Sequence, residues 1–285
     1  MISEISPSVA IVILNWQNWA DTLACVSSVR KLEYPNYAVI IADNGSSNDS
    51  VEKLREQASD CRLLALSDNL GFGGGNNVAI SEATAAEFDY IWLLNSDTEV
   101  DPFALQALVC CAEADAKIGA VGSVLLYQHS PDTVQAWGGG RINFLLGRST
   151  TLTAKVGAHE VHYLTAASIL LRTRALGDAG AFDPKFFMYW EDADLCVRLK
   201  QSGWKLAVAE DARVLHRESA SLGKRNPVLD LYYSRSVVVF FRKHSKMPSL
   251  PIFLSAVLRT AKRLLTGHFR SALAILRGTW EALRQ

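Results

Sequence analysis

Three acids follow a run of large apolar residues in Phe186-Phe-Met-Tyr-Trp-Glu-Asp-Ala-Asp194. We expect the acids to begin a helix, where the helix dipole favours negative charge and would by itself explain them. A carboxylate at the lip of a cleft can also act as a general base, with the aromatic residues shaping an acceptor site. Asp194 and Arg198, spaced i,i+4, predict an ion pair on the helix surface.

A second group of polar residues, Asn95-Ser-Asp97, follows the apolar segment 90–94. A carboxylate at a strand end, here Asp97, can hold a hard divalent cation such as Mn²⁺ or Mg²⁺, which in turn binds a diphosphate. Asn95 can add a carbonyl oxygen, although the same residues also fit a helix N-cap turn. His216 ends the last short strand. A lone histidine is usually structural, but beside a metal and a diphosphate it is a plausible ligand.

The segment Asn69-Leu-Gly-Phe-Gly-Gly-Gly-Asn-Asn77 is expected to be a loop between a strand and a helix. Glycines let backbone amides approach phosphates at a helix N-terminus, and a flexible turn is the alternative. A dinucleotide fingerprint would need glycine where Asn76 stands and would follow the first strand, so an oxidoreductase is disfavoured. Asp43 ends the second strand and can accept the imide N–H of uracil or thymine, although Asp-Asn-Gly-Ser is also a common turn.

Four apolar segments must position these residues. The segments 9–14, 37–42, 62–66 and 90–94 predict strands, and helices are expected at 19–31, 51–58, before residue 86 and after Pro102. Alternating strands and helices indicate an α/β fold with a parallel sheet, in which ligands bind at the carboxyl ends of the strands. Polar residues lie at all four ends: Asn15, Asp43, Asp68–Asn69 and Asn95–Asp97. We therefore expect one site at this edge.

The second half of the chain is less regular. We expect a strand at 119–127, a turn at 138–140, one or two strands within 162–171, a helix at 192–201, and two short strands at 204–209 and 213–216. Helices are predicted at 227–244 and, as one or two segments, at 251–283. No internal repeat or low-complexity linker separates these elements.

The composition is that of a globular protein. The 285 residues are 49% hydrophobic and carry 29 basic and 29 acidic side chains. This balance argues against disorder and against nucleic acid as a partner. The five cysteines include no C-x-x-C pair, which favours reduced thiols and a cytoplasmic location. No signal peptide is visible in residues 1–8, and the apolar run 247–258 is shorter than the roughly 20 residues of a spanning helix.

The last forty residues, 246–285, form a basic tail in which Glu281 is the only acid. Arg263, Arg270, Arg277 and Arg284 recur every seven residues, which predicts one basic helical face. An apolar stripe accompanies them: Leu254, Leu258, Ala261, Leu265, Phe269, Leu273, Leu276, Trp280 and Leu283. Such a helix can lie on the anionic inner face of the cytoplasmic membrane. It can equally pack on the rest of the chain or on a second copy in a homodimer.

Together these motifs resemble glycosyltransferase family 2, whose members have the GT-A fold for nucleotide-diphospho-sugar transferases. The resemblance covers roughly residues 8–245, and the motifs around residues 11–16, 41–47, 69–77, 93–100 and 186–196 occur in the family's order. The versions containing Asn-Leu-Gly-Phe and Phe-Phe-Met-Tyr look most like the rhamnosyltransferase-like branch. That branch uses dTDP-L-rhamnose to build O-antigen, capsule or other cell-surface polysaccharide.

The resemblance implies an inverting enzyme that moves a sugar to a hydroxyl of a glycan or polyprenyl-linked acceptor. It implies a catalytic domain at 1–245, with a nucleotide-binding half at 1–100 and an acceptor-binding half at 101–245, followed by the helical tail. Asp192 would be the general base, with Glu191 supporting or replacing it, and Asp97 and His216 would bind the metal. The remaining implied contacts are Asn15, Trp16, Asp43, Asn69, Gly71, Gly74, Asn76 and Ser96 for the nucleotide, and Tyr189, Trp190 and Ala167 for the acceptor.

The sequence departs from the family pattern twice. Asn95 replaces the first acid of the D-x-D motif, which makes the metal site less anionic. Thr165-Ala-Ala-Ser168 replaces Thr-Gly-Ala-Ser, and the added methyl group would narrow the acceptor cleft. UDP-hexose, UDP-GlcNAc and UDP-galactofuranose remain alternative donors. A non-catalytic sugar-nucleotide binding protein is a further alternative. A nucleotidyltransferase would normally carry a basic, glycine-rich loop where this chain has Asn15-Trp-Gln-Asn18.

Overall fold

The computed structural model describes residues 6–217 and 226–284, and its first half is built on four parallel strands. These are β1 (Val9–Asn15), β2 (Tyr37–Asp43), β3 (Arg62–Ala65) and β4 (Tyr90–Asn95), in the spatial order β3-β2-β1-β4. Asn15 pairs with Asp43, and Leu14 pairs with Asn95. The register therefore confirms that the polar strand ends meet at one edge of the sheet.

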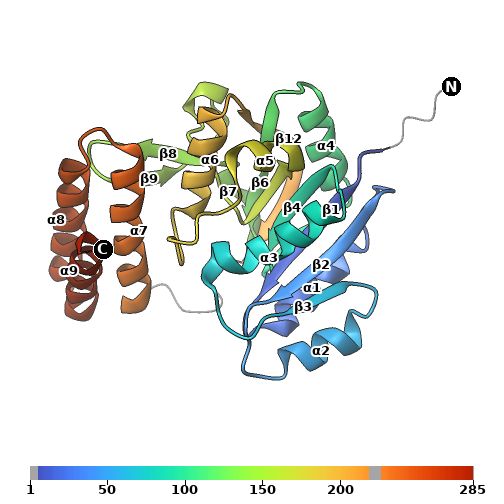
Figure 1. Cartoon of the computed structure of the whole chain (residues 1–285), viewed down its shortest axis with the longest axis horizontal. Coiled ribbons are helices and arrows are strands. Elements are labelled where there is room, and N and C mark those ends of the chain that lie inside the picture. The colour runs from blue at the N-terminus through green and yellow to red at the C-terminus, as the bar shows by residue number, and fades with distance from the viewer. Residues whose placement is uncertain (1–5, 218–225, 285) are drawn as a thin grey trace.

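Helices cover both faces of this sheet (Figure 1). Along β1, Val9, Ile11 and Ile13 pack into one apolar cluster, and Ala10 and Val12 pack into another. This alternation explains why β1 is a continuous apolar run. Residues of α1 (Trp19–Val29) and α4 (Ala104–Glu113) belong to the first cluster, and residues of α3 (Gly71–Ala85) to the second; α2 (Ser50–Gln57) lies beside β3.

The sheet continues into the second half with mixed strand directions. β11 (Ser168–Arg172) runs antiparallel to both β4 and β6 (Ile118–Tyr127), while β12 (Lys205–His216) runs parallel to β6. β7 (Ser130–Trp137) and β5 (Thr98–Val100) add antiparallel edges. The parallel arrangement predicted from the sequence thus holds throughout the first half, and in the second half it holds for β6 and β12. The two short strands predicted at 204–209 and 213–216 are one strand, β12, whose register shifts between Ala209 and Arg213.

The second half also contains a small second sheet of three strands, separate from the central sheet. It contains β10 (Tyr163–Leu164), β8 (Gly139–Asn143) and β9 (Arg148–Thr151). The predicted turn at 138–140 is wrong for Gly139 and Gly140, because both belong to β8 and pair with β10. The connecting helices are a short 3-10 turn at Ala158–Glu160, α5 (Thr173–Ala179) and α6 (Glu191–Gln201).

The C-terminal region is a group of three helices, α7 (Pro227–His244), α8 (Ser249–Leu265) and α9 (Phe269–Leu283), at the end of the molecule remote from the parallel strands (Figure 1). The tail prediction needs correction, because the helix is interrupted at residues 266–268. Arg263 lies on α8 and the other three arginines follow the break, so the predicted single basic face does not exist. In the described part of the chain, no helix is long and apolar enough to cross a membrane.

Candidate active site

Two adjacent cavities open where the strand ends meet α6. The first, about 370 Å³, is walled by strand-end residues that include Trp16, Asn69, Ser96 and Ala167. The second cavity, about 380 Å³, is bordered by the small sheet. Its wall includes Ser149, Thr151, Thr153, Tyr163 and Tyr233. The walls share five residues: Thr165, Tyr189, Glu191, Asp192 and His216. The shared wall divides one continuous site into two compartments.

Asp97 and His216 lie next to each other in the wall of the first cavity. Asp97 is in the turn between β4 and β5, and His216 is the last residue of β12. Nε2 of His216 lies 3.2 Å from Oδ1 of Asp97, and 3.3 Å from the amide nitrogen of Asn95. The two come together because β12 pairs with β5, which places His216 opposite Thr98. Burial alone would raise the pKa of Asp97, but the contact with His216 outweighs it and lowers the pKa below its usual range.

The metal-binding groups at this position suit a cation whose coordination is completed by a bound substrate. Among residues 6–217 and 226–284, no group of three or more His, Cys, Asp or Glu side chains could hold a metal ion alone. Asp97 and His216 supply two ligands, and Mg²⁺-type ions are commonly held by one or two carboxylates plus substrate phosphates. The residues therefore fit a cation completed by a diphosphate, rather than a closed structural site.

Gln135 of β7 is a residue that the sequence analysis missed. Its side-chain oxygen lies 2.7 Å from Nδ1 of His216, and an amide oxygen can only accept, so Nδ1 carries the proton. This leaves Nε2 facing Asp97. Partners of this kind orient metal-binding histidines and select their tautomer. No sequence motif marks Gln135, because its role depends on β7 and β12 flanking β6.

The two acids at the start of α6 occupy the shared wall. They follow Tyr189 and Trp190, which both have positive φ angles of 69° and 68°. Such backbone strain is uncommon for bulky residues and concentrates at functional sites. Burial raises the pKa of Asp192 to about 6, against the lowering effect of backbone amides that include Ala193 and Ala166. Burial and the neighbouring Asp192 raise the pKa of Glu191 well above its ordinary value.

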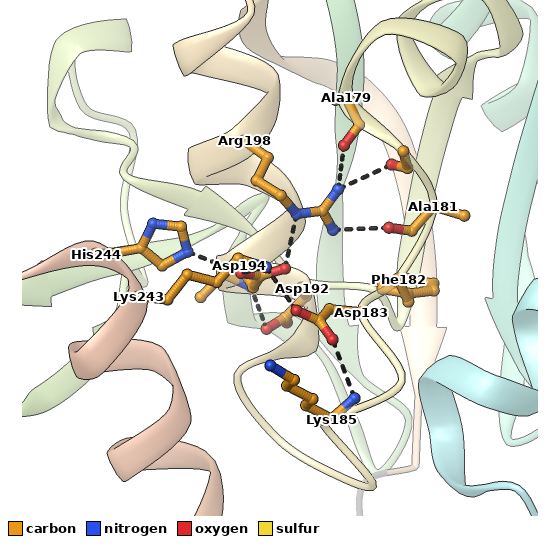
Figure 2. Close-up of polar contacts among 12 residues, drawn as sticks. Ala179, Ala181, Phe182, Asp183, Lys185, Asp192, Asp194, Arg198, Lys243 and His244 are labelled. Atoms are coloured by element: carbon orange, nitrogen blue, oxygen red, sulfur yellow. Dashed lines mark hydrogen bonds and ion pairs between the residues drawn. The ribbon is translucent and has the colours of Figure 1, made fainter.

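Asp194, two residues further on, does not form the predicted surface pair. Its carboxylate is fully buried and bonds Arg198 Nε at 2.8 Å, His244 Nε2 at 2.7 Å and Lys243 Nζ at 2.9 Å (Figure 2). Arg198 in turn donates to the carbonyls of Ala179, Gly180 and Ala181. The i,i+4 spacing found Arg198 correctly, but the α7 partners made the pair an internal anchor between α6, α7 and the segment before Phe182.

The nucleotide residues implied by the resemblance divide into two groups. Trp16, Asn69, Gly71 and Ser96 line the first cavity, together with Asn44, which the sequence analysis did not single out. Asp43 is buried behind the wall, where it accepts from Asn15 Nδ2 at 2.6 Å and from Ser46 N at 2.9 Å. A direct contact from Asp43 or Asn15 to a nucleotide base therefore stays a prediction.

The glycine-rich segment is helix rather than the predicted loop, since α3 begins at Gly71. Gly71 has a φ of +77°, and a Cβ there would collide with the carbonyl of Phe187. Phe72 N donates to that carbonyl at 2.8 Å. Gly74 and Asn76 do not line the first cavity, and Asn76 Nδ2 donates to Phe72 O instead. These glycines let α3 approach the segment that precedes Asp192.

The residues implied for the acceptor lie on both sides of the shared wall. Tyr189 lines both cavities, Trp190 the second and Ala167 the first. Trp190 packs against Phe240 and Phe241 of α7, with ring centroids 4.7 and 5.4 Å apart. Helix α7 thereby supports the back of the second cavity. Trp190 is mainly a packing residue in this arrangement.

The fold and the site define a class of protein. The structure resembles a mannosyltransferase from Pyrobaculum calidifontis in complex with GDP-Man and Mn²⁺, with a TM-score of 0.62 at 15% identity over 98% of this chain and 76% of that one. It also resembles GalNAc-T7 with UDP, GalNAc and Mn²⁺, with a TM-score of 0.64 at 16% identity over 82% of this chain and 48% of that one. The fold is that of a GT-A glycosyltransferase.

Sequence comparisons identify the family. The model described as glycosyltransferase like family 2 matches residues 7–226, so the chain belongs to this family and is a glycosyltransferase. An N-acetylglucosaminyl-diphospho-decaprenol L-rhamnosyltransferase of Mycobacterium tuberculosis is 29% identical, over 73% of this chain and 76% of that protein. Rhamnosyltransferase WbbL of Escherichia coli is 26% identical, over 64% of this chain and 73% of that protein. These relatives support the rhamnosyltransferase-like branch.

Proposed function

We propose that this glycosyltransferase moves L-rhamnose from dTDP-L-rhamnose to a hydroxyl of a glycan carried on a polyprenyl diphosphate. The rhamnosyltransferase relatives support the donor, and the decaprenol-linked substrate named for the mycobacterial relative supports the acceptor class. The observation that carries the reaction is the position of Asp192 on the wall between two cavities. The donor occupies the first cavity and the acceptor glycan the second, where serine, threonine and tyrosine hydroxyls suit a polyhydroxylated ligand.

Asp192 acts as the base in this proposal. The acceptor hydroxyl oxygen attacks the anomeric carbon from the face opposite the diphosphate, and its proton passes to the Asp192 carboxylate. The bond from the anomeric carbon to the diphosphate oxygen breaks, the nucleoside diphosphate leaves, and the configuration inverts. A pKa raised to about 6 suits this role, because the carboxylate is still ionised at neutral pH but binds a proton more readily than an exposed aspartate.

Asp97 and His216 would hold a divalent cation, Mn²⁺ or Mg²⁺, together with the donor diphosphate. When bound, such a cation offsets the negative charge that develops on the leaving diphosphate. Asn95 stands 3.3 Å from His216 Nε2 and donates no negative charge, so the protein contributes one carboxylate to the site. We therefore propose a site whose affinity for metal depends strongly on the nucleotide.

A comparison of nucleotide sugars distinguishes dTDP-L-rhamnose from the alternative donors. We expect dTDP-L-rhamnose with Mn²⁺ to raise the thermal midpoint more than UDP-hexose, UDP-GlcNAc or UDP-galactofuranose, and turnover to release free nucleoside diphosphate. Preferential stabilisation by a UDP-sugar would contradict the donor and retain the reaction. Release of pyrophosphate would instead indicate a nucleotidyltransferase, and binding without any turnover a sugar-nucleotide binding protein.

Asp97→Ala tests the metal. Loss of a liganding carboxylate should weaken Mn²⁺-dependent donor binding by more than the roughly 10–100-fold typical of an outer partner. Calorimetric titration of nucleoside diphosphate with and without Mn²⁺ measures the effect. Binding without Mn²⁺ should change little, because Asp97 acts through the cation. Wild-type transfer that persists in EDTA would show that no metal is needed.

Gln135→Leu tests the orientation of His216. Without the acceptor for its Nδ1 proton, His216 can adopt the other tautomer, and Mn²⁺ affinity in the presence of nucleoside diphosphate should fall by about 10–100-fold. Gln135→Glu keeps an acceptor oxygen and should restore most of the affinity. Equal Mn²⁺ titrations for all three proteins would exclude this positioning role.

A further inference from the structure

The α8 helix holds two arginine side chains on its inward face and exposes most of its large apolar side chains on the outward face. Its inward face carries Pro251, Ile252 and Ser255, together with Arg259 and Arg263. Both arginines bond the buried carboxylate of Asp230 on α7, at 2.8 and 3.0 Å. Its large apolar residues instead face outward: Leu250, Phe253, Val257, Leu258, Leu264 and Leu265. Cations are therefore held inside the helix group and apolar side chains outside it.

The α9 helix also turns most of its large apolar residues outward. Its buried residues are small apart from Ile275, and at Gly278 a Cβ would collide with the carbonyl of Leu231 on α7. The large residues again face outward: Phe269, Leu273, Leu276, Trp280 and Leu283. Leu265 is 89% exposed, Phe269 69% and Leu273 67%, around the turn that joins the two helices. We call the outward residues of α8 and α9 the apolar face. Clusters of this kind mark contacts with a partner or a membrane.

Charge around the apolar face is almost entirely positive. Lys246, Lys262, Arg270 and Arg284 are exposed, and within the described residues none of them forms an ion pair. The one acid of the tail, Glu281, is neutralised by Arg235 and Arg277. The arginines that could have been counted as surface charge, Arg259 and Arg263, are already satisfied by Asp230. The tail that carries the apolar face thus has four exposed cations without a carboxylate partner among the described residues, and one of them, Arg284, lies over the Trp280 ring of that face at 5.1 Å.

We infer that the apolar face docks on the surface of an anionic lipid bilayer. A second copy of this chain would bring the same four cations against each other, whereas anionic headgroups would neutralise them. At about 1.5 Å per residue, the 17 residues of α8 reach about 25 Å, short of the roughly 30 Å hydrocarbon core. The two helices therefore lie in the interface, with apolar side chains among the acyl chains and cations at the headgroups. This inference stands apart from the choice of donor and acceptor.

Flotation of the full chain with vesicles tests the docking, without donor or acceptor. We expect binding to vesicles of phosphatidylcholine with phosphatidylglycerol, and at least about tenfold weaker binding to phosphatidylcholine alone. The triple variant Leu265→Ser, Phe269→Ser, Leu273→Ser should lower the partition coefficient by about a hundredfold, because it removes the most exposed apolar area. The matched control is Phe103→Ser, which removes a side chain that is 63% exposed at the start of α4, and this variant should bind as wild type.

A charge variant keeps the test decisive if the serine variant folds poorly. Lys262→Glu with Arg270→Glu leaves the apolar face intact and should weaken binding to anionic vesicles by about tenfold or more. Absence of wild-type flotation would overturn the inference, as would equal binding by the triple variant. A dimer in sedimentation that the triple variant abolishes, without flotation, would assign the face to a second copy. Equal binding to neutral and anionic vesicles would overturn the role of the cations.

Discussion

Asp192→Asn should lower the rate of sugar transfer by a factor of about 10²–10⁴, while donor binding stays close to wild type. The substitution keeps the shape of the side chain but replaces the basic carboxylate that takes the acceptor proton with an amide, which is not basic enough to take it. Asp192 lies on the wall that the two cavities share, and its proposed role is in the chemical step rather than in binding the diphosphate. Single-turnover transfer and donor titration together separate the chemical step from binding.

Glu191→Gln is the matched control. Burial and the nearby Asp192 raise the pKa of Glu191 well above its ordinary value, which favours the neutral acid that glutamine imitates. We expect this variant to retain far more activity than Asp192→Asn. The opposite ranking would assign the base to Glu191, which the sequence left as the alternative.

The pH dependence of the rate of sugar transfer gives a second test of Asp192. The base must be ionised, so transfer should rise with pH through about 6, where Asp192 loses its proton, and then level off. The residual activity of Asp192→Asn should lack this limb. A wild-type profile without an inflection near pH 6 would contradict the assignment of the acid limb to Asp192, whose pKa is raised to about 6.

Asp194→Ala should lower the free energy of unfolding by about 3–5 kcal/mol, because it leaves the buried Arg198 guanidinium without its carboxylate partner. Arg198 and His244 are largely buried, with side chains 15% and 3% exposed, so water cannot replace the lost carboxylate (Figure 2). Urea unfolding measures the loss. Glu82→Ala breaks the exposed pair with Arg62 and serves as the control, for which we expect a far smaller change.

The acid dependence of stability follows from the same network. Burial acts to raise the pKa of Asp194, but hydrogen bonds from His244 and Lys243 and the charge of Arg198 outweigh it and lower the pKa to about 2. A depressed carboxyl pKa stabilises the fold above the unfolded value near 4, and this contribution is lost as the pH falls toward 2. The stability difference between wild type and Asp194→Asn should therefore narrow over that interval. A constant difference would contradict the ionised role of Asp194.

Local pattern was sufficient for the parallel half of the molecule. The β-branched run of β1 and its polar end at Asn15 predict a buried strand and a site, because strand alternation and parallel register act within a few residues. The same reasoning located Asp97, while the acids at 191 and 192 were identified from their position at a predicted helix start. Helical periodicity predicted α7 closely and the span of α8 and α9 together, without placing the break between them.

Only the tertiary structure decided how those residues act. The sequence contains Gln135, but only the flanking of β6 by β7 and β12 brings it to His216. The spacing of Asp194 and Arg198 predicts a surface pair, and α7 turns it into a buried anchor. The glycines at 71–75 suit phosphate binding and helix packing equally; the structure adds the close approach of Phe187 at Gly71, while phosphate binding stays a prediction. In the tail, the stripe predicts an amphipathic face, but the ion pairs of Asp230 with Arg259 and Arg263 on α8, and the close packing of Gly278 of α9 on α7, accompany the apolar side facing out. Each of these outcomes depends on contacts between segments far apart in the chain, which no local pattern encodes.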